Sequence, residues 1–203
     1  MIIKMIYVMA KKNQLTTSDY LSVDELKRLM KSLRKDNEYI WELYVRLSFS
    51  TALRASDVLS LTWEEILCRS YFIKREQKTG KTRKIPINDY TQKCIEEMYI
   101  IADKPNPSEV IFKSKITGLP FTIQYVNHKI KKWKEKYNIK IGNFSTHTFR
   151  KSFGRYVYDS AVDKSEALVL LNKIFKHTAI ETTKVYIGLR EEEIQSVFES
   201  INI

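Results

Sequence analysis

The chain has 203 residues, with 35 Lys and Arg against 24 Asp and Glu, which gives a formal net charge of +11 at pH 7. A hydrophobic content of 43% beside 29% charged residues is typical of a globular protein and excludes a disordered chain. The longest apolar runs, Met5 to Ala10 and Ala167 to Leu171, are too short to cross a bilayer, so we expect one main soluble domain and no membrane partner.

The start of the chain and the cysteines bear on its location. The first apolar run is interrupted by Lys4 and leads into Lys11 and Lys12, so we expect a mature N-terminus rather than a signal peptide. Cys68 and Cys94 stand in neither metal-binding nor redox spacing, which indicates a reducing cytoplasm. Because the other candidate ligands are only three histidines, no structural zinc is expected.

Helical spacing predicts three helices in the first part of the chain. The first covers about 23–35 and opens with a capping box, Ser22 to Glu25. The second covers Tyr39 to Thr51, and a short third begins after Ser56, a good N-cap residue. The apolar residues expected to face the core are Leu26, Met30, Leu33, Ile40, Leu43, Tyr44, Leu47, Val58, Leu59 and Leu61.

The hydrophobic period then changes to that of β-strands. Three short strands are predicted, over Ile66 to Cys68, Tyr71 to Glu76 and Arg83 to Ile87. The last two form a hairpin across Lys78-Thr-Gly-Lys81, and Pro86 suits the end of an edge strand. A small three-stranded antiparallel sheet is therefore expected.

The second half of the chain reads as helices. Asp89 is predicted to cap a helix that runs to about Ala102, and Thr122 to cap another whose lysines face outward. A third opens near Ser145, and Ser165 is expected to cap the next. A short helix around Tyr186 and a terminal one complete the chain, the latter with Ile194, Val197, Phe198 and Ile201. The fold class is α+β, mainly α: a helical bundle with a small sheet.

Positive charge is concentrated in two segments. An excess of +11 favours a polyanionic partner, nucleic acid ahead of a membrane surface, with a merely basic surface as the alternative. Lysines and arginines of this kind hold phosphates without reading sequence. The residues are Lys74, Arg75, Lys78, Lys81, Arg83 and Lys84 in one segment and Lys129, Lys131, Lys132, Lys134 and Lys136 in the other.

Two segments carry arginines that are able to bind a phosphodiester. Arg54 lies at a turn between two predicted helices, where its guanidinium can point at a phosphate. His147 and Arg150 stand three residues apart on a helix, which predicts an anion clamp beside a proton carrier. Taken alone, each has a simpler structural explanation: Arg54 pairs with Asp57 or another acid, and the other two form a surface pair.

Two further segments carry groups able to transfer protons or attack phosphorus. His177 stands nine residues before Tyr186, whose phenol has an ordinary pKa near 10 and needs nearby cations or a base to act as a nucleophile. Lys78, at the hairpin tip, either protonates a leaving oxygen or only binds a nucleic-acid backbone. The alternative for Tyr186, one of 12 tyrosines, is a helix anchor.

In this order, the four segments resemble the catalytic domain of the tyrosine recombinases (phage integrases), which share fold and chemistry with type IB topoisomerases. Thr51-Ala-Leu-Arg-Ala-Ser-Asp-Val-Leu-Ser-Leu61 resembles the first box, T-G-L-R-x-S-E-L-x-x-L, and Gln77 to Pro86 the β-hairpin lysine segment. Ser145 to Phe153 resembles the second box, H-x-L-R-H/K-T/S-F, and Phe175 to Tyr186 the nucleophile box, L-G-H-S-S-I-x-T-T-x-x-Y. The resemblance covers about 20–190, and four ordered boxes are more specific than one motif.

The resemblance implies a mechanism and a site. Tyr186 attacks a DNA phosphodiester and forms a 3′-phosphotyrosyl link, while Arg54 and Arg150 hold the non-bridging oxygens and His177 donates a further hydrogen bond. The general acid and base complete the expected catalytic set: His147 assists removal of the Tyr186 proton, and Lys78, with Lys81 as the alternative, protonates the leaving 5′-oxygen. No metal and no cofactor are needed.

The chain departs from the family pattern in three places. Ala52 stands where the first box has Gly, Asp57 where Glu is more frequent, and Phe175-Lys176 where Leu-Gly precedes the histidine. None of these changes removes a catalytic group, so the expected activity stands.

The domain organisation expected from the resemblance is an N-terminal extension over 1–20 and a catalytic domain over 21–203. Most family members also carry a helical core-binding domain of roughly a hundred residues. An extension of 20 residues is too short to form such a domain. The chain therefore resembles either the short recombinases that act with the catalytic domain alone, similar to fimbrial phase-switching invertases, or a fragment of a longer integrase.

The expected partner is double-stranded DNA with specific inverted-repeat sites, bound by a homotetramer that is monomeric in solution. The segment after Arg190 is expected to dock on a neighbouring protomer or, alternatively, to fold back on its own core. A bacterial, phage or mobile-element origin implies work in the cytoplasm at the nucleoid. Two rival functions stay open: a type IB topoisomerase-like relaxing enzyme and a catalytically idle DNA-binding module.

Overall fold

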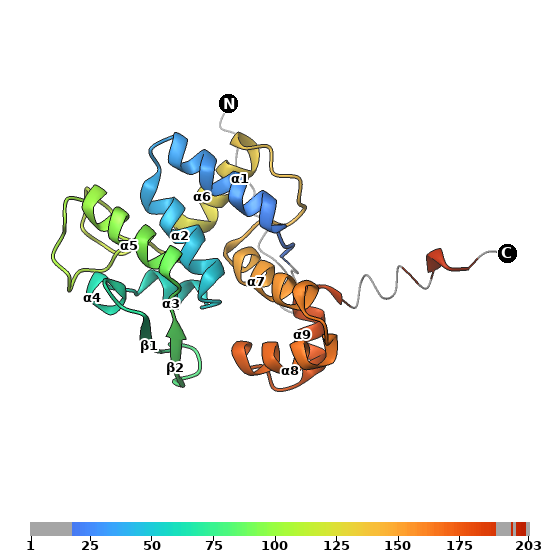
Figure 1. The fold of residues 1–203 in the computed structure, drawn as a ribbon. Helices are drawn as coiled ribbons and strands as arrows, with labels where there is room; N and C mark the ends of the chain where they lie inside the picture. Colours follow the sequence, from blue (N-terminus) through green and yellow to red (C-terminus); the bar gives the residue numbers. More distant parts are fainter. Residues whose placement is uncertain (1–17, 190–195, 197, 202–203) are drawn as a thin grey trace, which may run out of the picture.

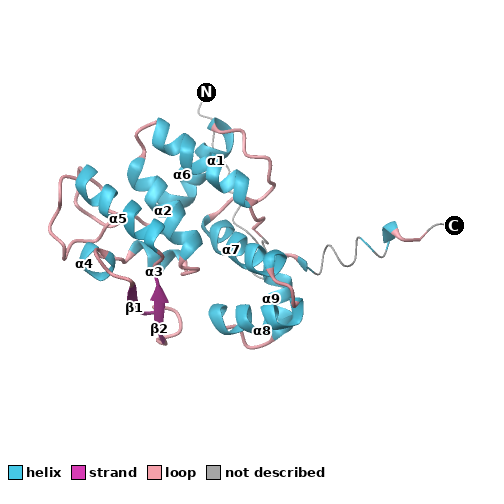
Figure 2. Ribbon diagram, viewed as in Figure 1, coloured by secondary structure: helices cyan, strands magenta, loops and turns pink. Residues whose placement is uncertain are grey.

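The computed structural model describes residues 18–189, 196 and 198–201. Helices dominate it, and a β-hairpin extends from one edge (Figures 1 and 2). The elements in chain order are α1 (Val23–Lys35), α2 (Tyr39–Ser50), α3 (Ala55–Leu59), α4 (Trp63–Ile66), β1 (Tyr71–Arg75), β2 (Thr82–Pro86), α5 (Asp89–Ile101), α6 (Ile123–Lys136), α7 (Thr146–Ser160), α8 (Lys164–Phe175) and α9 (Ile180–Ile187).

The sheet has two strands, and the predicted third strand over Ile66 to Cys68 is wrong. β1 and β2 pair antiparallel, with Tyr71 opposite Pro86 at one end of the ladder. Ile66 instead ends α4, a helical turn whose start is stabilised by the Thr62 N–H, which donates to the Glu65 carboxylate at 2.9 Å. A helical turn thus takes the apolar residue that the sequence pattern assigned to a strand.

Helix starts agree with the sequence where the predicted cap binds the third backbone N–H of the helix. Ser22 with Glu25 forms the predicted capping box, and Thr122 accepts from the Tyr125 N–H. Three helices have an N-cap one or two residues earlier than predicted, since a residue upstream already has the extended backbone of a cap. These caps are Arg54, Asn88 and Asp163 in place of Ser56, Asp89 and Ser165.

The core consists of two apolar clusters joined by α7. The larger one lies among α1, α2, α5 and α6 and includes Phe149 of α7. The smaller one packs α8 and α9 against the next turn of α7, through Phe153, and also takes in Ala52 from the segment after α2. Figure 1 shows α8 and α9 together on one side of α7, with the β-hairpin beside them. The seam between the clusters brings together segments that are far apart in the sequence.

The structure tests few of the predictions made for the two ends of the chain. Residues 1–17, most of the expected N-terminal extension, lie outside the described residues, as do Ile194 and Val197 of the expected terminal helix. Phe198 and Ile201 are described and exposed. No helix in the described part of the chain has the length and apolar character of a membrane span.

Candidate active site

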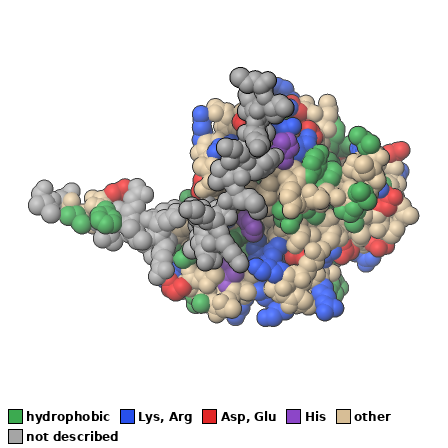
Figure 3. Space-filling model, turned by 180° about the vertical axis from the view of Figure 1, so that it is seen from behind, with side chains coloured by type: hydrophobic (Ala, Val, Ile, Leu, Met, Phe, Trp, Pro, Cys, Tyr) green, Lys and Arg blue, Asp and Glu red, His purple; other side chains and the backbone are tan. Residues whose placement is uncertain are grey.

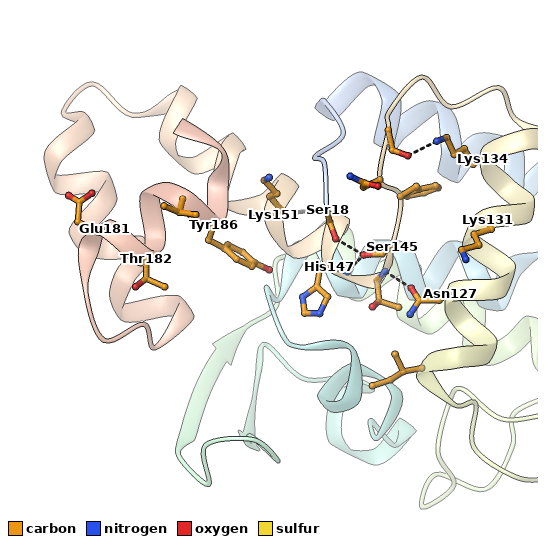
Figure 4. Close-up of a pocket in the computed structure, with 16 residues that line it drawn as sticks. Ser18, Asn127, Lys131, Lys134, Ser145, His147, Lys151, Glu181, Thr182 and Tyr186 are labelled. Carbon is orange, nitrogen blue, oxygen red and sulfur yellow. Dashed lines mark hydrogen bonds between the residues drawn. The ribbon is translucent and has the colours of Figure 1, made fainter. Parts of the chain in front are cut away.

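Tyr186 lies on α9 and faces a pocket of about 910 Å³. Its side chain extends toward His147, which lies on the opposite side of this space at the start of α7 (Figure 4). The phenolic oxygen is buried and has no hydrogen-bond partner among the described residues. An unpartnered buried hydroxyl costs free energy, so one at the wall of a pocket is suited to react with or bind a ligand there.

Arg150 lies on α7, close enough to this tyrosine for its charge to act on the phenol. Its guanidinium donates to the carbonyl oxygens of Ala52 and Phe175, the latter at 3.0 Å, and lies 4.6 Å from the Phe175 ring centre. Burial lowers the pKa of Arg150 to about 10, so the side chain is still charged at neutral pH. Among the described residues it forms no ion pair with a carboxylate, so its buried positive charge is stabilised by two carbonyl dipoles and the Phe175 ring.

Arg54 reaches the same place from the N-cap position of α3. Its Nη1 donates to the Glu76 carboxylate at 2.5 Å, and its Nη2 lies 3.5 Å from the Phe175 carbonyl oxygen. The acid that pairs with Arg54 is thus Glu76 and not Asp57. The Asp57 carboxylate accepts from the Gln77 N–H at 2.8 Å, and this bond holds the hairpin turn next to Lys78.

His177 follows α8 and lies beside Tyr186, with ring centres 5.2 Å apart. Its Nδ1 is 3.0 Å from the hydroxyl oxygen of Thr183. Partial burial, followed by the charges of Arg150 and Arg54, lowers the pKa of His177 to about 4. The ring is therefore neutral at physiological pH and can offer one N–H as a donor.

His147 and Lys78 lie at the exposed rim of this site. The His147 side chain lines the pocket. Partial desolvation of the ring lowers the pKa of His147, and the positive charges of Arg150, Lys78 and Arg54 lower it further. A neutral imidazole can accept a proton. His147 and Arg150 stand three residues apart on α7, but they differ in exposure: His147 is exposed and Arg150 is buried.

The environment of Tyr186 favours the neutral phenol. Burial raises the pKa of Tyr186 above its usual range. The Arg150 guanidinium, through its charge and its position as a nearby donor, opposes that rise, followed by the charge of Arg54. At neutral pH the hydroxyl keeps its proton, so nucleophilic attack requires a base.

The structure gathers all six predicted site residues around the seam between the two core clusters. Four lie within or beside the buried part, and two lie at the rim. They are Arg54, Arg150, His177 and Tyr186 inside and Lys78 and His147 at the rim. A cluster of guanidinium, imidazole and phenol groups of this kind can bind one phosphate and stabilise negative charge on its oxygens. Among the described residues, no three His, Cys, Asp or Glu side chains are grouped to bind a metal.

Sequence reasoning missed three residues that hold this arrangement. The sequence pattern places Glu76 in a predicted strand and Arg83 in a basic segment, and nothing in the nucleophile box distinguishes Thr183, but all three bind site residues or their partners. One signal was available: Glu76 is the only acidic residue between Arg69 and Ile87, a stretch rich in Lys and Arg, which suggests an internal counter-ion.

The prediction that all these lysines and arginines form a phosphate-binding surface is wrong for two of them. Lys74 is buried in an ion pair with Glu65, and Arg83 forms an ion pair with the buried Glu76, so neither offers its charge to a surface ligand. Lys129 and Lys136 form ion pairs with acids. Exposed lysines do lie near the pocket, whose wall includes Lys131 of α6. On the face in Figure 3, histidine side chains lie beside those of lysine and arginine.

Comparisons with known proteins agree on one family. A model of the phage integrase family matches residues 19–193. The tyrosine recombinase XerD of Staphylococcus aureus is 27% identical over 190 residues, which cover 91% of this chain and 62% of XerD. A probable integrase/recombinase of Bacillus subtilis, YoeC, is 25% identical over 178 residues, which cover 88% of this chain and 93% of YoeC. The chain thus spans about six-tenths of the length of XerD.

Solved structures have the same fold. The XerH site-specific recombinase bound to a palindromic difH substrate, in a post-cleavage complex, aligns with a TM-score of 0.67 and 18% identity, over 96% of this chain and 60% of XerH. The XerA recombinase aligns with a TM-score of 0.66 and 20% identity, over 91% of this chain and 66% of XerA. At these identities the likeness establishes the fold, a mainly helical domain with a small antiparallel sheet.

Proposed function

The chain belongs to the phage integrase family, and on that basis we propose that it is a site-specific tyrosine recombinase that cuts and rejoins double-stranded DNA. One observation carries the proposal: the buried Tyr186 hydroxyl lies beside Arg150, a buried guanidinium without a carboxylate partner among the described residues. A phosphate in this space neutralises the arginine charge and brings phosphorus to the phenol.

In the proposed cleavage step, the Tyr186 oxygen attacks the phosphorus of a DNA phosphodiester in line. A phosphorus–phenol oxygen bond forms as the bond to the 5′-oxygen breaks, which gives a 3′-phosphotyrosyl link and a free 5′-hydroxyl. Arg54 and Arg150 hold the non-bridging oxygens, on which negative charge develops. His177 donates its N–H to the same phosphate.

Two protons move in this step. His147 accepts the proton of the phenol, a role supported by the lowered pKa that keeps its imidazole neutral. Lys78 gives a proton to the leaving 5′-oxygen, and the anchoring of the adjacent Gln77 by Asp57 supports its placement. The phosphotyrosyl ester keeps the free energy of the broken bond, so a second 5′-hydroxyl can attack it and rejoin the strand. The step as written needs no cofactor.

The wider organisation follows from the same proposal. Residues 21–203 form the catalytic domain and 1–20 an extension, and the target is a pair of specific inverted-repeat sites. The protein is monomeric in solution, and four copies assemble on two DNA duplexes. The exposed side chains of Phe198 and Ile201 are available to dock on a neighbouring copy. Such a protein acts where bacterial or mobile-element DNA lies, at the nucleoid.

Covalent capture tests the proposal and identifies the target sequence in one experiment. Nicked suicide duplexes with randomised half-sites are incubated with the protein, and DNA in SDS-resistant complexes is recovered and sequenced. We expect complexes with the wild type that carry an inverted-repeat consensus, and none with Tyr186→Phe. Absence of SDS-resistant complexes with the wild type, or equal amounts with Tyr186→Phe, would contradict covalent catalysis by Tyr186.

The same protein and DNA also distinguish the proposed recombinase from the two rival functions. A type IB topoisomerase-like enzyme relaxes any supercoiled plasmid and gives no consensus sequence. An idle DNA-binding module retains DNA in the absence of SDS but forms no covalent complex. A recombinase joins two duplexes only when both carry the recovered site.

A further inference from the structure

Glu76 is a fully buried carboxylate that the proposed mechanism does not use. It follows β1 and has no exposed surface. It accepts hydrogen bonds from three side chains: Arg54 at 2.5 Å, the Thr79 hydroxyl at 3.0 Å and Arg83 at 3.3 Å. Burial raises its pKa, but these donors outweigh burial and the pKa lies below the usual range, so Glu76 is ionised at neutral pH. A buried carboxylate with this many partners fixes their positions.

Arg83, the second arginine on Glu76, connects segments from both sides of the site. Its Nη2 donates to the Thr51 carbonyl at 2.9 Å, and its Nη1 to the Ile174 carbonyl at 3.2 Å. These carbonyls lie at the C-terminal ends of α2 and α8, where helix dipoles place partial negative charge. Arg83 thus ties the segment before Arg54 to the segment before His177 and holds the hairpin against both.

The negative charge of Glu76 also affects the balance of charge around Arg150. Three guanidinium groups converge here, and the charges of Arg54 and Arg83 both lower the pKa of Arg150. Glu76 is the only carboxylate with an ion pair to any of the three in the described part of the chain. It therefore offsets the repulsion that would otherwise push Arg54 away from Arg150.

We propose that Glu76 and Arg83 are positioning residues for the recombinase reaction, which hold the Arg54 guanidinium at the angle at which it meets the phosphate together with Arg150. This inference rests on the proposed function. Phosphate binding and phosphate activation respond differently to loss of Glu76: without this negative charge the site attracts phosphate at least as strongly, but Arg54 loses its fixed orientation.

The test compares single-turnover cleavage by variants of the 203-residue chain on the recovered suicide duplex. The limiting rate and the half-saturating DNA concentration are measured separately. We expect Glu76→Gln, which keeps shape but not charge, to lower the limiting rate about 10²-fold. The half-saturating DNA concentration stays equal or falls. Arg83→Gln lowers the rate similarly, and Arg83→Lys, which keeps the charge, recovers part of it.

Glu42→Gln is the matched control. Glu42 is also buried and binds two arginines, Arg34 at 2.8 Å and Arg46 at 3.0 Å. It lies nine residues before Thr51 on α2, about 14 Å away along the helix axis. We expect this variant to lose thermal stability but to keep the wild-type limiting rate. Equal rate losses for Glu42→Gln and Glu76→Gln, or a wild-type rate for folded Glu76→Gln, would overturn the positioning role.

A measurement that does not depend on cleavage keeps the inference separate from the proposed function. In ¹⁵N-detected arginine spectra, the Nη signals of Arg54, assigned with Arg54→Lys, should be resolved in the wild type because the ion pair hinders rotation of the guanidinium. They should merge in Glu76→Gln. Resolved signals in both proteins would overturn the inference, whereas a wild-type protein that forms no covalent complex would overturn the proposed function.

Discussion

The Nδ1 atom of His177 lies 3.0 Å from the hydroxyl oxygen of Thr183, a residue without exposed surface on α9. The same oxygen accepts a hydrogen bond from the Asn172 side chain at 3.2 Å. With one lone pair occupied by Asn172, the Thr183 hydroxyl can still give its proton to Nδ1, and this direction places the hydrogen of the neutral imidazole on Nε2. We expect Thr183 to orient the ring in this way and so to favour the tautomer that can donate to a phosphate.

Removing this hydroxyl should slow cleavage. Thr183→Val keeps the shape of the side chain but leaves Nδ1 and the Asn172 amide without their partner, so we expect a 10- to 100-fold lower cleavage rate, on the order of the loss of one oriented donor. Thr183→Ser, which retains the hydroxyl, should stay within about threefold of the wild type. If both variants cleave equally well, Thr183 does not set the tautomer.

Gly154 is a point of close approach between α7 and the smaller core cluster. A Cβ at this position would lie 2.7 Å from Cγ2 of Ile187 and 2.8 Å from Cζ of Phe175. Because Phe175 packs against both Arg150 and Tyr186, Gly154→Ala should destabilise the protein by about 1–3 kcal/mol and also lower cleavage. Urea unfolding and suicide-duplex cleavage measure the two effects; an unchanged midpoint of unfolding would contradict the packing argument.

The neutral His177 should make stability depend on pH. Its pKa is about 4 in the folded protein against 6.5 as the ordinary value, so the unfolded chain binds this proton first. The contribution of neutral His177 to the free energy of unfolding is complete above about pH 6.5 and is lost as the pH falls toward about 4. Free energies of unfolding at pH 7 and pH 5 should therefore differ less in His177→Asn than in the wild type. His147 shifts in the same direction, so part of the slope should remain. An unchanged slope would exclude this contribution.

The choice between Lys78 and Lys81 as general acid can be settled by changing the leaving group. A 5′-bridging sulfur leaves as a thiolate and needs no proton, so it restores cleavage to a variant that lacks the acid. We expect Lys78→Ala to be slow on ordinary DNA and near the wild-type rate on the sulfur substrate. Lys81→Ala should behave like the wild type on both. The reverse pattern would assign the role to Lys81.

The sequence predicts the mainly helical fold and the segments that the structure brings together around Tyr186. Tyr186 and the arginines stand in ordered boxes whose chemistry can be recognised, and helical spacing located the helices that carry them. The strand expected at Ile66 failed because an apolar run of three residues fits a helical turn as well as a strand, and the Thr62–Glu65 cap decides between them.

Local patterns do not identify which residues pair in buried ion pairs. Glu76 and Arg83 lie in strand-like segments where charge normally indicates exposure, and their partners come from distant parts of the chain. Lys74 misled in the same way, because its ion pair with Glu65 depends on how α4 packs beside β1. Only the tertiary structure distinguishes a charge that binds a ligand from one that holds the fold.

Mass spectrometry of the captured adduct tests the central claim most directly. After cleavage of the suicide duplex, nuclease and trypsin digestion should leave a nucleotide on the peptide 185–190, which contains Tyr186. We predict attachment through a 3′-phosphate to the phenolic oxygen and a free 5′-hydroxyl on the released strand. An adduct on any other side chain, or a link through a 5′-phosphate, would contradict the account.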